Sequence, residues 1–302
     1  MIYTITLNPA LDYDIYLDNF KKAKLNLSKK INFRAGGKGI NVSIMLKNLE
    51  NTSYSLGYIA GFTGKYILNS LDEMKINHNF IHISGITRIN VKINDELDET
   101  EIAGISPKIG EKDIEKLKEY ISKLNKDDIL VLAGSIPNSL KNDIYKEFSM
   151  ATKAKIVLDT RGNLLLQNIH NNLLIKPNIK ELEDVFSIKI ETDEQIYELC
   201  QTFINQGVEN VLVSMGSKGA ILVKKGKYLK ADIPKGIYIN SIGSGDSMVA
   251  GFIHAHTKNL DDIESLKLAV ACGSATAYSY GIGEKELVNK LKNSIKIQEV
   301  II

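Results

Sequence analysis

A chain of 302 residues is long enough for one large α/β domain or for two domains. Apolar residues make up 44% of it and charged residues 25%, and the net charge of +2 indicates neither nucleic acid nor a membrane surface as a partner. Its two cysteines, Cys200 and Cys272, lie far apart and outside any CxxC pattern, which argues against a disulfide framework and against a structural zinc site. No run of 18 apolar residues and no signal peptide is evident, so we expect a cytoplasmic protein.

The first predicted element is a strand over residues 2–7, where β-branched and aromatic side chains alternate. Asn8 and Pro9 end this strand, and Asp12 follows shortly after. A carboxylate at this place is well positioned for a ligand at the carboxyl edge of a sheet. The alternative is a turn or cap role for Asp12. The polar, alternating segment that comes next predicts short exposed strands.

Residues 33–39 predict a glycine-rich loop that leads into a helix from Ile40 to Leu49. Gly36 and Gly37 precede Lys38 there, but the spacing of a Walker A loop is absent. Such a loop lets the backbone approach a polar ligand closely, and the Asn41 amide offers donors and an acceptor to hydroxyl groups. The alternative is a tight turn that binds nothing.

Residues 87–94 predict a strand in which Arg88, Asn90 and Lys92 share one face, because they are spaced by two. A face that carries both Arg and Lys suits a bound phosphate, with Arg as a bidentate donor. The alternative is a solvent-exposed face. The two alternating polar segments, at about 13–32 and 86–107, are predicted to form a small β lid.

From Asp128 onward, predicted strands and helices alternate at the spacing of βαβ units. This pattern favours a mostly parallel sheet with helices on both faces. We find no repeat or linker, so the sequence predicts a single α/β domain over residues 1–302 with the lid strands inserted into it.

The segment 240–252 holds a second glycine-rich stretch, in which Gly243 and Gly245 flank Ser244 and Asp246 follows at once. A helix starting near Asp246 would point its free N–H groups at one spot, which makes a site for a phosphate. A carboxylate beside a bound anion needs a chemical task, and the natural one is to accept the proton of an attacking hydroxyl. The alternative is that Asp246 merely caps the helix.

Four motifs in this order make the chain resemble the ribokinase-like (PfkB) sugar kinase family over essentially its whole length. They are Ala35-Gly-Gly-Lys-Gly-Ile-Asn-Val42, Lys176-Pro-Asn-Ile-Lys-Glu181, Ser214-Met-Gly-Ser-Lys-Gly219 and Ser241-Ile-Gly-Ser-Gly-Asp-Ser247. Two departures are small, since Ser244 stands where the family usually has Ala and Met215 where it usually has Leu. The resemblance implies a three-layer α/β/α fold with a mostly parallel sheet and a small β-sheet lid.

The resemblance also implies a role for each matching residue. Asp246 would be the base, with Gly243, Ser244 and Gly245 forming an anion hole for the transferring phosphate. The sugar would be held by Asp12, Gly36, Gly37, Lys38 and Asn41, and its phosphate by Arg88, with Lys24, Lys92 and Ser135 as weaker candidates. ATP would contact Lys176, Asn178, Ser214, Gly216, Gly219 and Gly273, and Glu181 would organise Mg²⁺ through water.

Residues 4–12 and 87–92 resemble the branch of the family that acts on sugar phosphates. The implied reaction transfers the γ-phosphate of ATP to fructose 1-phosphate and gives fructose 1,6-bisphosphate; tagatose 6-phosphate or fructose 6-phosphate is the alternative acceptor. Two other hypotheses are a non-catalytic sugar-phosphate sensor and a ribokinase- or nucleoside-type kinase of unphosphorylated substrates. The family also implies Mg²⁺ and a homodimer formed through the lid.

Overall fold

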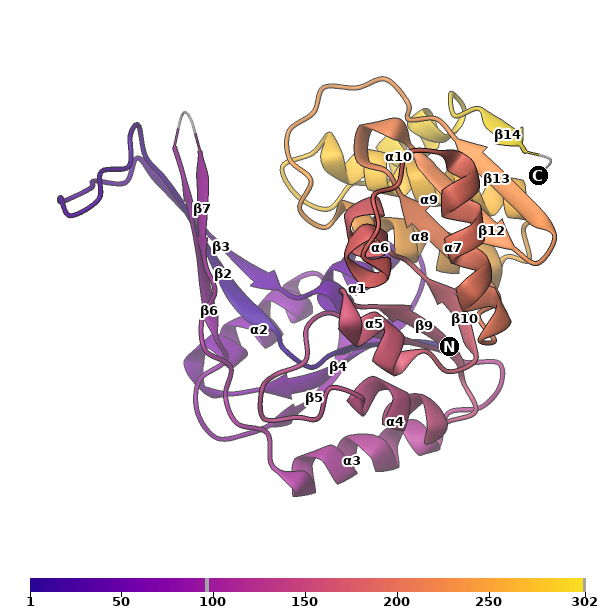
Figure 1. Cartoon of the computed structure of the whole chain (residues 1–302). Coiled ribbons are helices and arrows are strands. Elements are labelled where there is room, and N and C mark those ends of the chain that lie inside the picture. Colours follow the sequence, from indigo (N-terminus) through magenta and orange to yellow (C-terminus); the bar gives the residue numbers. More distant parts are fainter. Residues whose placement is uncertain (96–97, 301–302) are drawn as a thin grey trace.

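The computed structural model describes residues 1–95 and 98–300, and their strands form one large sheet and one small sheet (Figure 1). Within the described residues, the large sheet has ten strands in the order β14-β13-β12-β11-β10-β9-β8-β1-β4-β5. Their bounds are β14 (Ile297–Glu299), β13 (Lys227–Ala231), β12 (Ala220–Lys224), β11 (Val211–Ser214), β10 (Asn172–Ile175), β9 (Lys155–Asp159), β8 (Ile129–Ala133), β1 (Ile2–Thr6), β4 (Ser53–Ile59) and β5 (Asn77–His82). The strands from β11 to β5 are parallel, and β12, β13 and β14 continue the sheet in antiparallel pairs. This confirms the mostly parallel α/β fold.

Central strand β8 shows why the sheet is covered on both faces. All five of its side chains are apolar and buried. Ile129 and Val131 belong to one hydrophobic core, while Leu130 and Leu132 belong to another, because successive side chains of a strand point to opposite faces. A strand buried on both sides therefore reads as a continuous apolar run.

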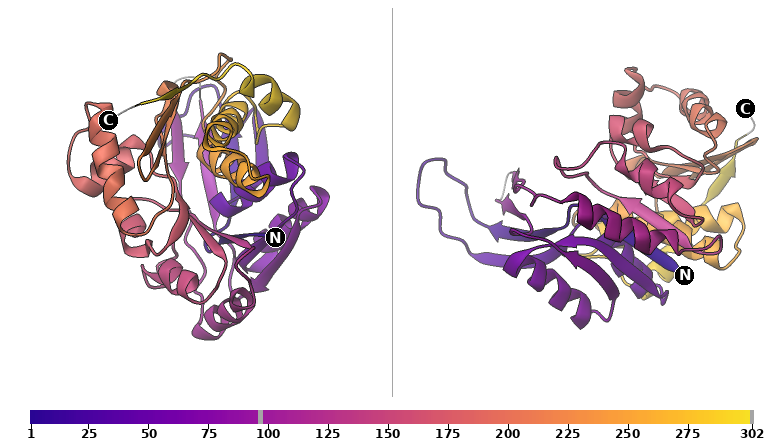
Figure 2. Two further views of the ribbon diagram at one scale, coloured as in Figure 1. Left: turned by 90° about the vertical axis from the view of Figure 1, so that its right-hand side faces the viewer. Right: turned by 90° about the horizontal axis from the view of Figure 1, so that it is seen from below.

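Helices cover the two faces of the large sheet (Figure 2). One face is covered by α1 (Lys38–Asn48), α8 (Ser244–Thr257), α9 (Asp262–Ala277) and α10 (Lys285–Lys292). The other face is covered by α3 (Glu111–Ser122), α4 (Ile144–Met150), α5 (Asn163–Asn168), α6 (Ile179–Phe186) and α7 (Asp193–Asn205). Helix α2 (Gly61–Glu73) packs in a third, smaller core with residues of β3 and β5, and so supports the junction of the two sheets. No helix among the described residues is both long and apolar enough to cross a membrane.

The small sheet has the order β3-β2-β6-β7 and stands out to one side of the large one (Figures 1 and 2). Its strands are β3 (Lys30–Gly36), β2 (Ala10–Tyr16), β6 (Ile89–Asn94) and β7 (Glu99–Ile102). The predicted lid segment 86–107 also contains residues 96–97, which lie outside the described residues. The register of the strands shows that the two faces of this sheet differ in polarity. Asp12 lies beside Arg34 and Asn90, whereas Tyr13 lies beside Phe33 and Val91. One face is therefore polar and the other apolar.

The prediction of a loop at residues 33–36 is wrong, because β3 continues through Gly36. The segment stays extended since Ala35 pairs with Leu11 and Gly36 pairs with Ala10. Glycine is needed at the last position: a Cβ on Gly36 would lie 2.6 Å from the Asp12 carboxylate. The glycine here makes room for the Asp12 carboxylate of the neighbouring strand, and the chain turns only at Gly37, which has φ of 133° and precedes α1.

Candidate active site

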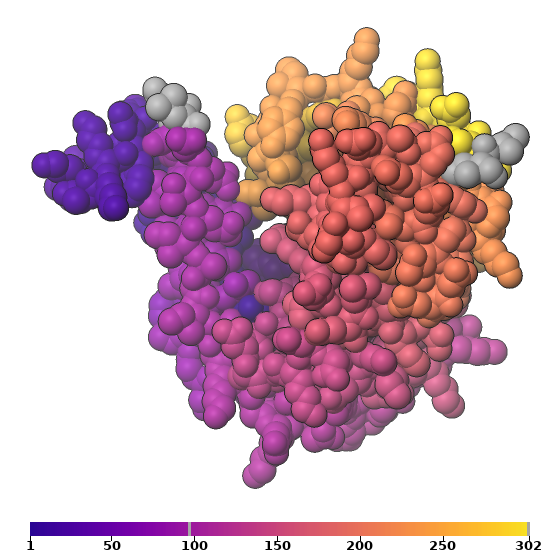
Figure 3. Space-filling view, in the orientation of Figure 1, coloured from indigo at the N-terminus to yellow at the C-terminus, as the bar shows by residue number. Residues whose placement is uncertain are grey.

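The predicted site residues gather at the carboxyl edge of the large sheet, next to the small sheet. Strands β1, β8, β9 and β10 are parallel, so they end at the same edge. Polar residues stand at or just beyond these ends, namely Asn8, Ser135, Asp159 and Lys176. The molecular surface is hollowed between the small sheet and the rest of the molecule (Figure 3). A ligand in this hollow can contact residues from both sheets.

The predicted anion site lies at the N-terminus of α8. Gly243 is the N-cap in a left-handed conformation with φ of 76°, and no side chain of the described residues caps the helix. Amides of a first helical turn have no intrahelical acceptor, so those of Gly245 and Asp246 are available to a ligand. The Ser244 hydroxyl is buried, without a hydrogen-bond partner in the described chain. Asp246 lies in the first turn rather than at the N-cap, so the alternative of a simple cap does not match the geometry.

Asp246 is buried and makes a hydrogen bond with a residue 205 positions away. Asn41 Nδ2, from the first turn of α1, donates to Asp246 Oδ2 at 2.7 Å. Burial raises the pKa of Asp246; Lys38 opposes this shift, Asp159 adds to it, and Asn41 and Lys176 oppose it. The carboxylate is thus fixed in orientation and more basic than an exposed aspartate, as a proton acceptor requires.

Two lysines and one aspartate form an ion cluster beside Asp246. Lys38 Nζ donates to Asp159 Oδ1 at 2.8 Å, and Lys176 Nζ lies 3.6 Å from the same oxygen. Burial disfavours ionisation of Asp159, but Lys176 and Lys38 outweigh it and lower its pKa. Sequence reasoning missed Asp159. The signal was present, because Asp159 ends a buried strand just as Asp12 follows one.

The polar face of the small sheet presents Asp12 to the hollow. Asn90 Nδ2 donates to Asp12 Oδ1 at 3.0 Å, and Arg34 Nη2 lies 3.5 Å from Oδ2. Arg34 also binds Asp14 through two hydrogen bonds, at 2.7 and 3.0 Å. Burial raises the pKa of Asp12 although Arg34, Asn90 and Lys92 counteract it and Asp14 adds to it. These contacts fix the orientation of the Asp12 carboxylate, and its contact with sugar hydroxyls remains a prediction.

Arg88 lies at the base of the small sheet, just before β6. Its Nη2 donates to the Asn8 carbonyl at 3.1 Å, whereas its Nε is buried with no partner among the described residues. Asn8 in turn donates from Nδ2 to Ser135 Oγ at 3.0 Å and so links Arg88 to the loop after β8. Lys92 is buried on the same face of the small sheet, 4.0 Å from Glu101. The contact of the Arg88 guanidinium with a phosphate remains a prediction.

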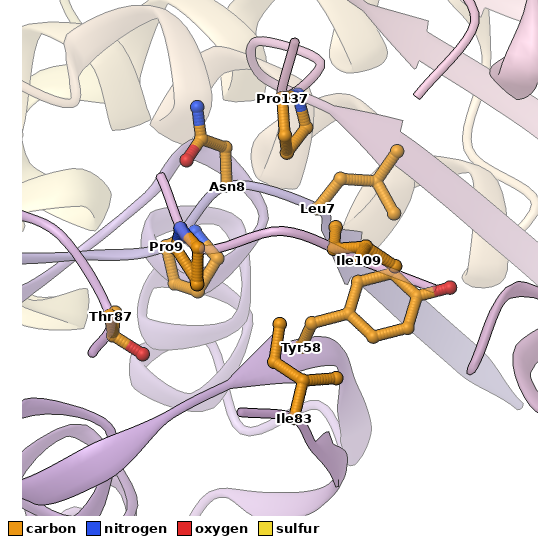
Figure 4. A pocket seen from close by; sticks show the side chains of 9 residues that line it. Leu7, Asn8, Pro9, Tyr58, Ile83, Thr87, Ile109 and Pro137 are labelled. Atoms are coloured by element: carbon orange, nitrogen blue, oxygen red, sulfur yellow. The ribbon is translucent and has the colours of Figure 1, made fainter. Parts of the chain in front are cut away.

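A small cavity of about 10 Å³ lies next to Asn8, lined mainly by apolar side chains such as Leu7, Tyr58 and Ile109 (Figure 4). This volume corresponds to about one water molecule. The cavity is therefore too small for a sugar and belongs to the packing beneath the site.

The predicted nucleotide residues meet next to Lys176. Asn178 caps α6 and forms a capping box with Glu181, in which Asn178 Oδ1 accepts from the Glu181 amide and Glu181 Oε2 accepts from the Asn178 amide. Ser214 forms a β-bridge with Asn178 and thereby brings the loop after β11 alongside. The capping box by itself accounts for both residue types, so their contact with ATP remains a prediction.

The loop after β11 turns at two glycines with positive φ. Gly216 has φ of 58° and Gly219 has φ of 92°, and a Cβ on Gly219 would lie 2.0 Å from the Ala231 carbonyl. This close approach explains glycine at position 219 without a ligand. Gly216 has open space around it, so it remains available to a nucleotide.

One predicted residue is not brought to this cluster. Lys24 is exposed in the loop 17–29, the indigo segment that projects beyond the small sheet in Figure 1. Gly273 is buried inside α9, where a Cβ would lie 2.6 Å from Met248 Cγ and 3.2 Å from the Ser244 carbonyl oxygen, so Gly273 lies beside the first turn of α8. Glycine at 273 serves the packing of α9 against α8, and its place beside adenine remains a prediction.

The chain is similar to known proteins over nearly its whole length. The model of the pfkB family of carbohydrate kinases matches residues 5–287. The chain is 41% identical to 1-phosphofructokinase of Borreliella burgdorferi, with 99% of both chains covered. It is 34% identical to D-tagatose-1-phosphate kinase of Bacillus licheniformis, with 98% of this chain and 99% of that protein covered.

A solved structure of another protein has a very similar fold. Phosphofructokinase-2 from Escherichia coli, in complex with substrates and products, aligns with a TM-score of 0.91 at 24% identity and covers 97% of this chain and 98% of that chain. At this identity the likeness concerns the fold. Together with the family match and the relatives, it leads to one conclusion: the chain belongs to the pfkB family of carbohydrate kinases.

Proposed function

We propose that the chain transfers the γ-phosphate of ATP to a hydroxyl of fructose 1-phosphate and produces fructose 1,6-bisphosphate. The observation that carries this proposal is the buried Asp246 carboxylate in the first turn of α8, bonded to Asn41 and flanked by Lys38 and Lys176. Phosphoryl transfer requires positioning, charge neutralisation and a proton acceptor, but no covalent step on the protein. This arrangement meets all three requirements.

In this proposal, the glycine-containing segment at the start of α8 binds the transferring phosphoryl group, and the one before α1 binds the sugar. The first-turn amides of α8 stabilise the transferring phosphoryl group, since donors aimed at developing charge are effective in a buried site. Asp12, Asn41 and the backbone at Gly36 and Gly37 orient the sugar hydroxyls. Asp246 Oδ1 or Oδ2 takes the proton of the attacking hydroxyl.

Mg²⁺ would accompany ATP, and the residues fit this ion. Glu181 is half-buried near Lys176 and Asn178, and one of its carboxylate oxygens is engaged in the capping box. A single carboxylate suits Mg²⁺, which keeps several waters and is often bound through them. When bound, the ion would neutralise charge on the triphosphate. The residues that would hold it are Glu181, through water, and the phosphates themselves.

The first prediction tests the acceptor with a coupled ADP-release assay in ATP and Mg²⁺. We expect the highest kcat/KM with fructose 1-phosphate, compared with fructose 6-phosphate, tagatose 6-phosphate and fructose itself. The support is the 41% identity to a 1-phosphofructokinase over the full chain. A preference for tagatose 6-phosphate or fructose 6-phosphate would make that sugar phosphate the acceptor, and the chain would still be a phosphosugar kinase. A preference for fructose would indicate a kinase of unphosphorylated sugars, and a ligand-induced thermal shift without ADP release would indicate a sensor.

We also propose a homodimer formed through the apolar face of the small sheet. Tyr13 and Phe33 stack there with ring centroids 4.6 Å apart, and Val91 lies beside Tyr13. Several apolar side chains on this face remain open to solvent, with exposed fractions of 47% for Ile31, 43% for Phe33 and 56% for Ile102. A contiguous exposed apolar face of this kind is typical of an interface. A second copy would cover it with the same residues, as a two-fold contact requires.

The second prediction concerns this interface and is measured by light scattering after size exclusion. We expect the wild type to have twice the monomer mass. In Phe33→Asp we expect the Kd of the dimer to rise about tenfold or more, because the substitution places a charge in an apolar contact. Met150→Asp is the matched control, since Met150 on α4 is 65% exposed and outside the small sheet. A monomeric wild type at micromolar concentration would contradict the proposal.

A further inference from the structure

Asp159 occupies an unusual position, because its carboxylate is fully buried and both lysines of the site use the same oxygen. Asp159 Oδ1 accepts from Lys38 Nζ at 2.8 Å and lies 3.6 Å from Lys176 Nζ. Its other oxygen, Oδ2, is buried without a hydrogen-bond partner in the described part of the chain. The three side chains come from α1, the end of β9 and the chain just after β10.

The ammonium group of Lys176 points at the anion site. A Cβ added to Gly245 would lie 2.9 Å from Lys176 Nζ, so this ammonium lies against the first turn of α8. Lys38 is close enough to Asp246 to oppose the rise of its pKa. Both positive charges therefore lie at the place where the transferring phosphate would sit.

Two ammonium groups that share one carboxylate oxygen are close neighbours and repel each other. A carboxylate between them offsets this repulsion and fixes both directions through charge-assisted contacts. Burying such a cluster is costly and is weak evidence for a purely structural role, since apolar residues could join α1 to β9 at lower cost. With Asp246 included, the cluster balances two positive charges with two negative ones before any ligand arrives.

We propose that Asp159 is a positioning residue that holds Lys38 and Lys176 side by side at the N-terminus of α8, aimed at the phosphoryl group in transfer. This inference rests on the proposed kinase function. It gives Lys38 a task at the phosphate in addition to the sugar contact implied by the family motif. Asp159 itself acts through the two lysines and does not contact the reacting atoms.

The third prediction concerns Asp159→Asn, which keeps the size of the side chain and removes its charge. We expect kcat to fall about 10- to 100-fold, as is usual when a residue that orients a functional group is lost. We also expect the acidic limb of the kcat/KM profile to move to lower pH. The reason is that Asp246 loses a negative neighbour that raises its pKa. A loss of packing alone, without the loss of this charge, would not move the limb.

A double-mutant cycle with Lys38→Met separates action through the lysine from a general loss of structure. In the Lys38→Met background, Asp159→Asn is expected to lower kcat by a smaller factor than in the wild type, and the loss that remains is the part that acts through Lys176. The same cycle is read on Mg²⁺·ATP affinity by calorimetry, which does not require turnover. Asp128→Asn is the matched control, because Asp128 is another buried aspartate, bonded to the amino group of Met1 before β8. This control is expected to keep the wild-type kcat.

An unmoved acidic limb, or additive effects in the cycle on both kcat and ATP affinity, would overturn the inference. Absence of ADP release by the wild type with every sugar phosphate would instead refute the proposed function, and the calorimetric cycle would still decide the positioning role. If Asp159→Asn fails to fold, Asp159→Glu keeps the charge but displaces it. This variant is expected to retain the acidic limb and lower kcat, and a wild-type kcat would overturn the inference.

Discussion

Asp246→Asn is expected to bind ATP and sugar phosphate with near-normal affinity and to lose kcat by roughly 10²- to 10⁴-fold, the usual contribution of a positioned base. The substitution keeps the shape of the side chain, and the new amide oxygen can still accept from Asn41 Nδ2. The proton of the attacking hydroxyl would have no acceptor. Steady-state ADP release gives kcat, and calorimetry gives both affinities.

The pH profile provides the internal control for this variant. Burial raises the pKa of Asp246, and Asp159 adds to the shift, although Lys38, Asn41 and Lys176 oppose it. Below its pKa the carboxyl is protonated and cannot accept a proton, so wild-type kcat/KM should fall with decreasing pH from above the ordinary aspartate range. The residual activity of Asp246→Asn should lack this limb. Turnover within about threefold of the wild type would refute the assignment of Asp246 as the base.

The layered fold could be predicted because its determinants are local. The five consecutive apolar residues of β8 predict a strand that is buried on both faces. The spacing of βαβ units predicts the helices between the parallel strands. Gly243, with φ of 76°, likewise marks the start of α8. In contrast, residues 33–36 predict a loop and form a strand, since a glycine that makes room for the side chain of a neighbouring strand looks the same in sequence as a glycine that turns the chain.

The parts of the site that could not be predicted depend on contacts between distant segments. Nothing near Asn41 indicates that its amide binds Asp246, which lies 205 positions further on. Asp14 falls in the predicted exposed strands and Arg34 in the predicted loop, and only the pairing of β2 with β3 places them together beside Asp12. Asp159 differs from these residues, because its place at the end of a buried strand is visible in the sequence; only its contacts with Lys38 and Lys176 depend on other elements. Local sequence patterns therefore predict the helices and strands, whereas the network of charged side chains is formed only when the tertiary fold brings distant segments together.

The role of Arg88 leads to the second large effect, a change in which acceptor the enzyme prefers. Burial lowers the pKa of Arg88 although Asp12 and Glu101 oppose this, and its Nε has no partner among the described residues. Leaving a buried donor unsatisfied is costly, and a planar guanidinium is suited to bind a phosphate through two N–H groups. The structure therefore keeps at this position a cation that an incoming sugar phosphate would satisfy.

Arg88→Met is expected to lower kcat/KM for fructose 1-phosphate about 100-fold, equivalent to about 3 kcal/mol or two charge-assisted hydrogen bonds. The value for unphosphorylated fructose should change by less than about threefold, because that substrate has no group for Arg88 to bind. Lys112→Met, an exposed site on α3, is the control for loss of one positive charge. Equal losses with both sugars would show that Arg88 supports the sheet junction through the Asn8 carbonyl, and the recognition of the phosphate would then fall to Lys92. A selective loss would instead mean that the buried, incompletely bonded guanidinium at the base of the small sheet is what distinguishes a sugar phosphate from a free sugar.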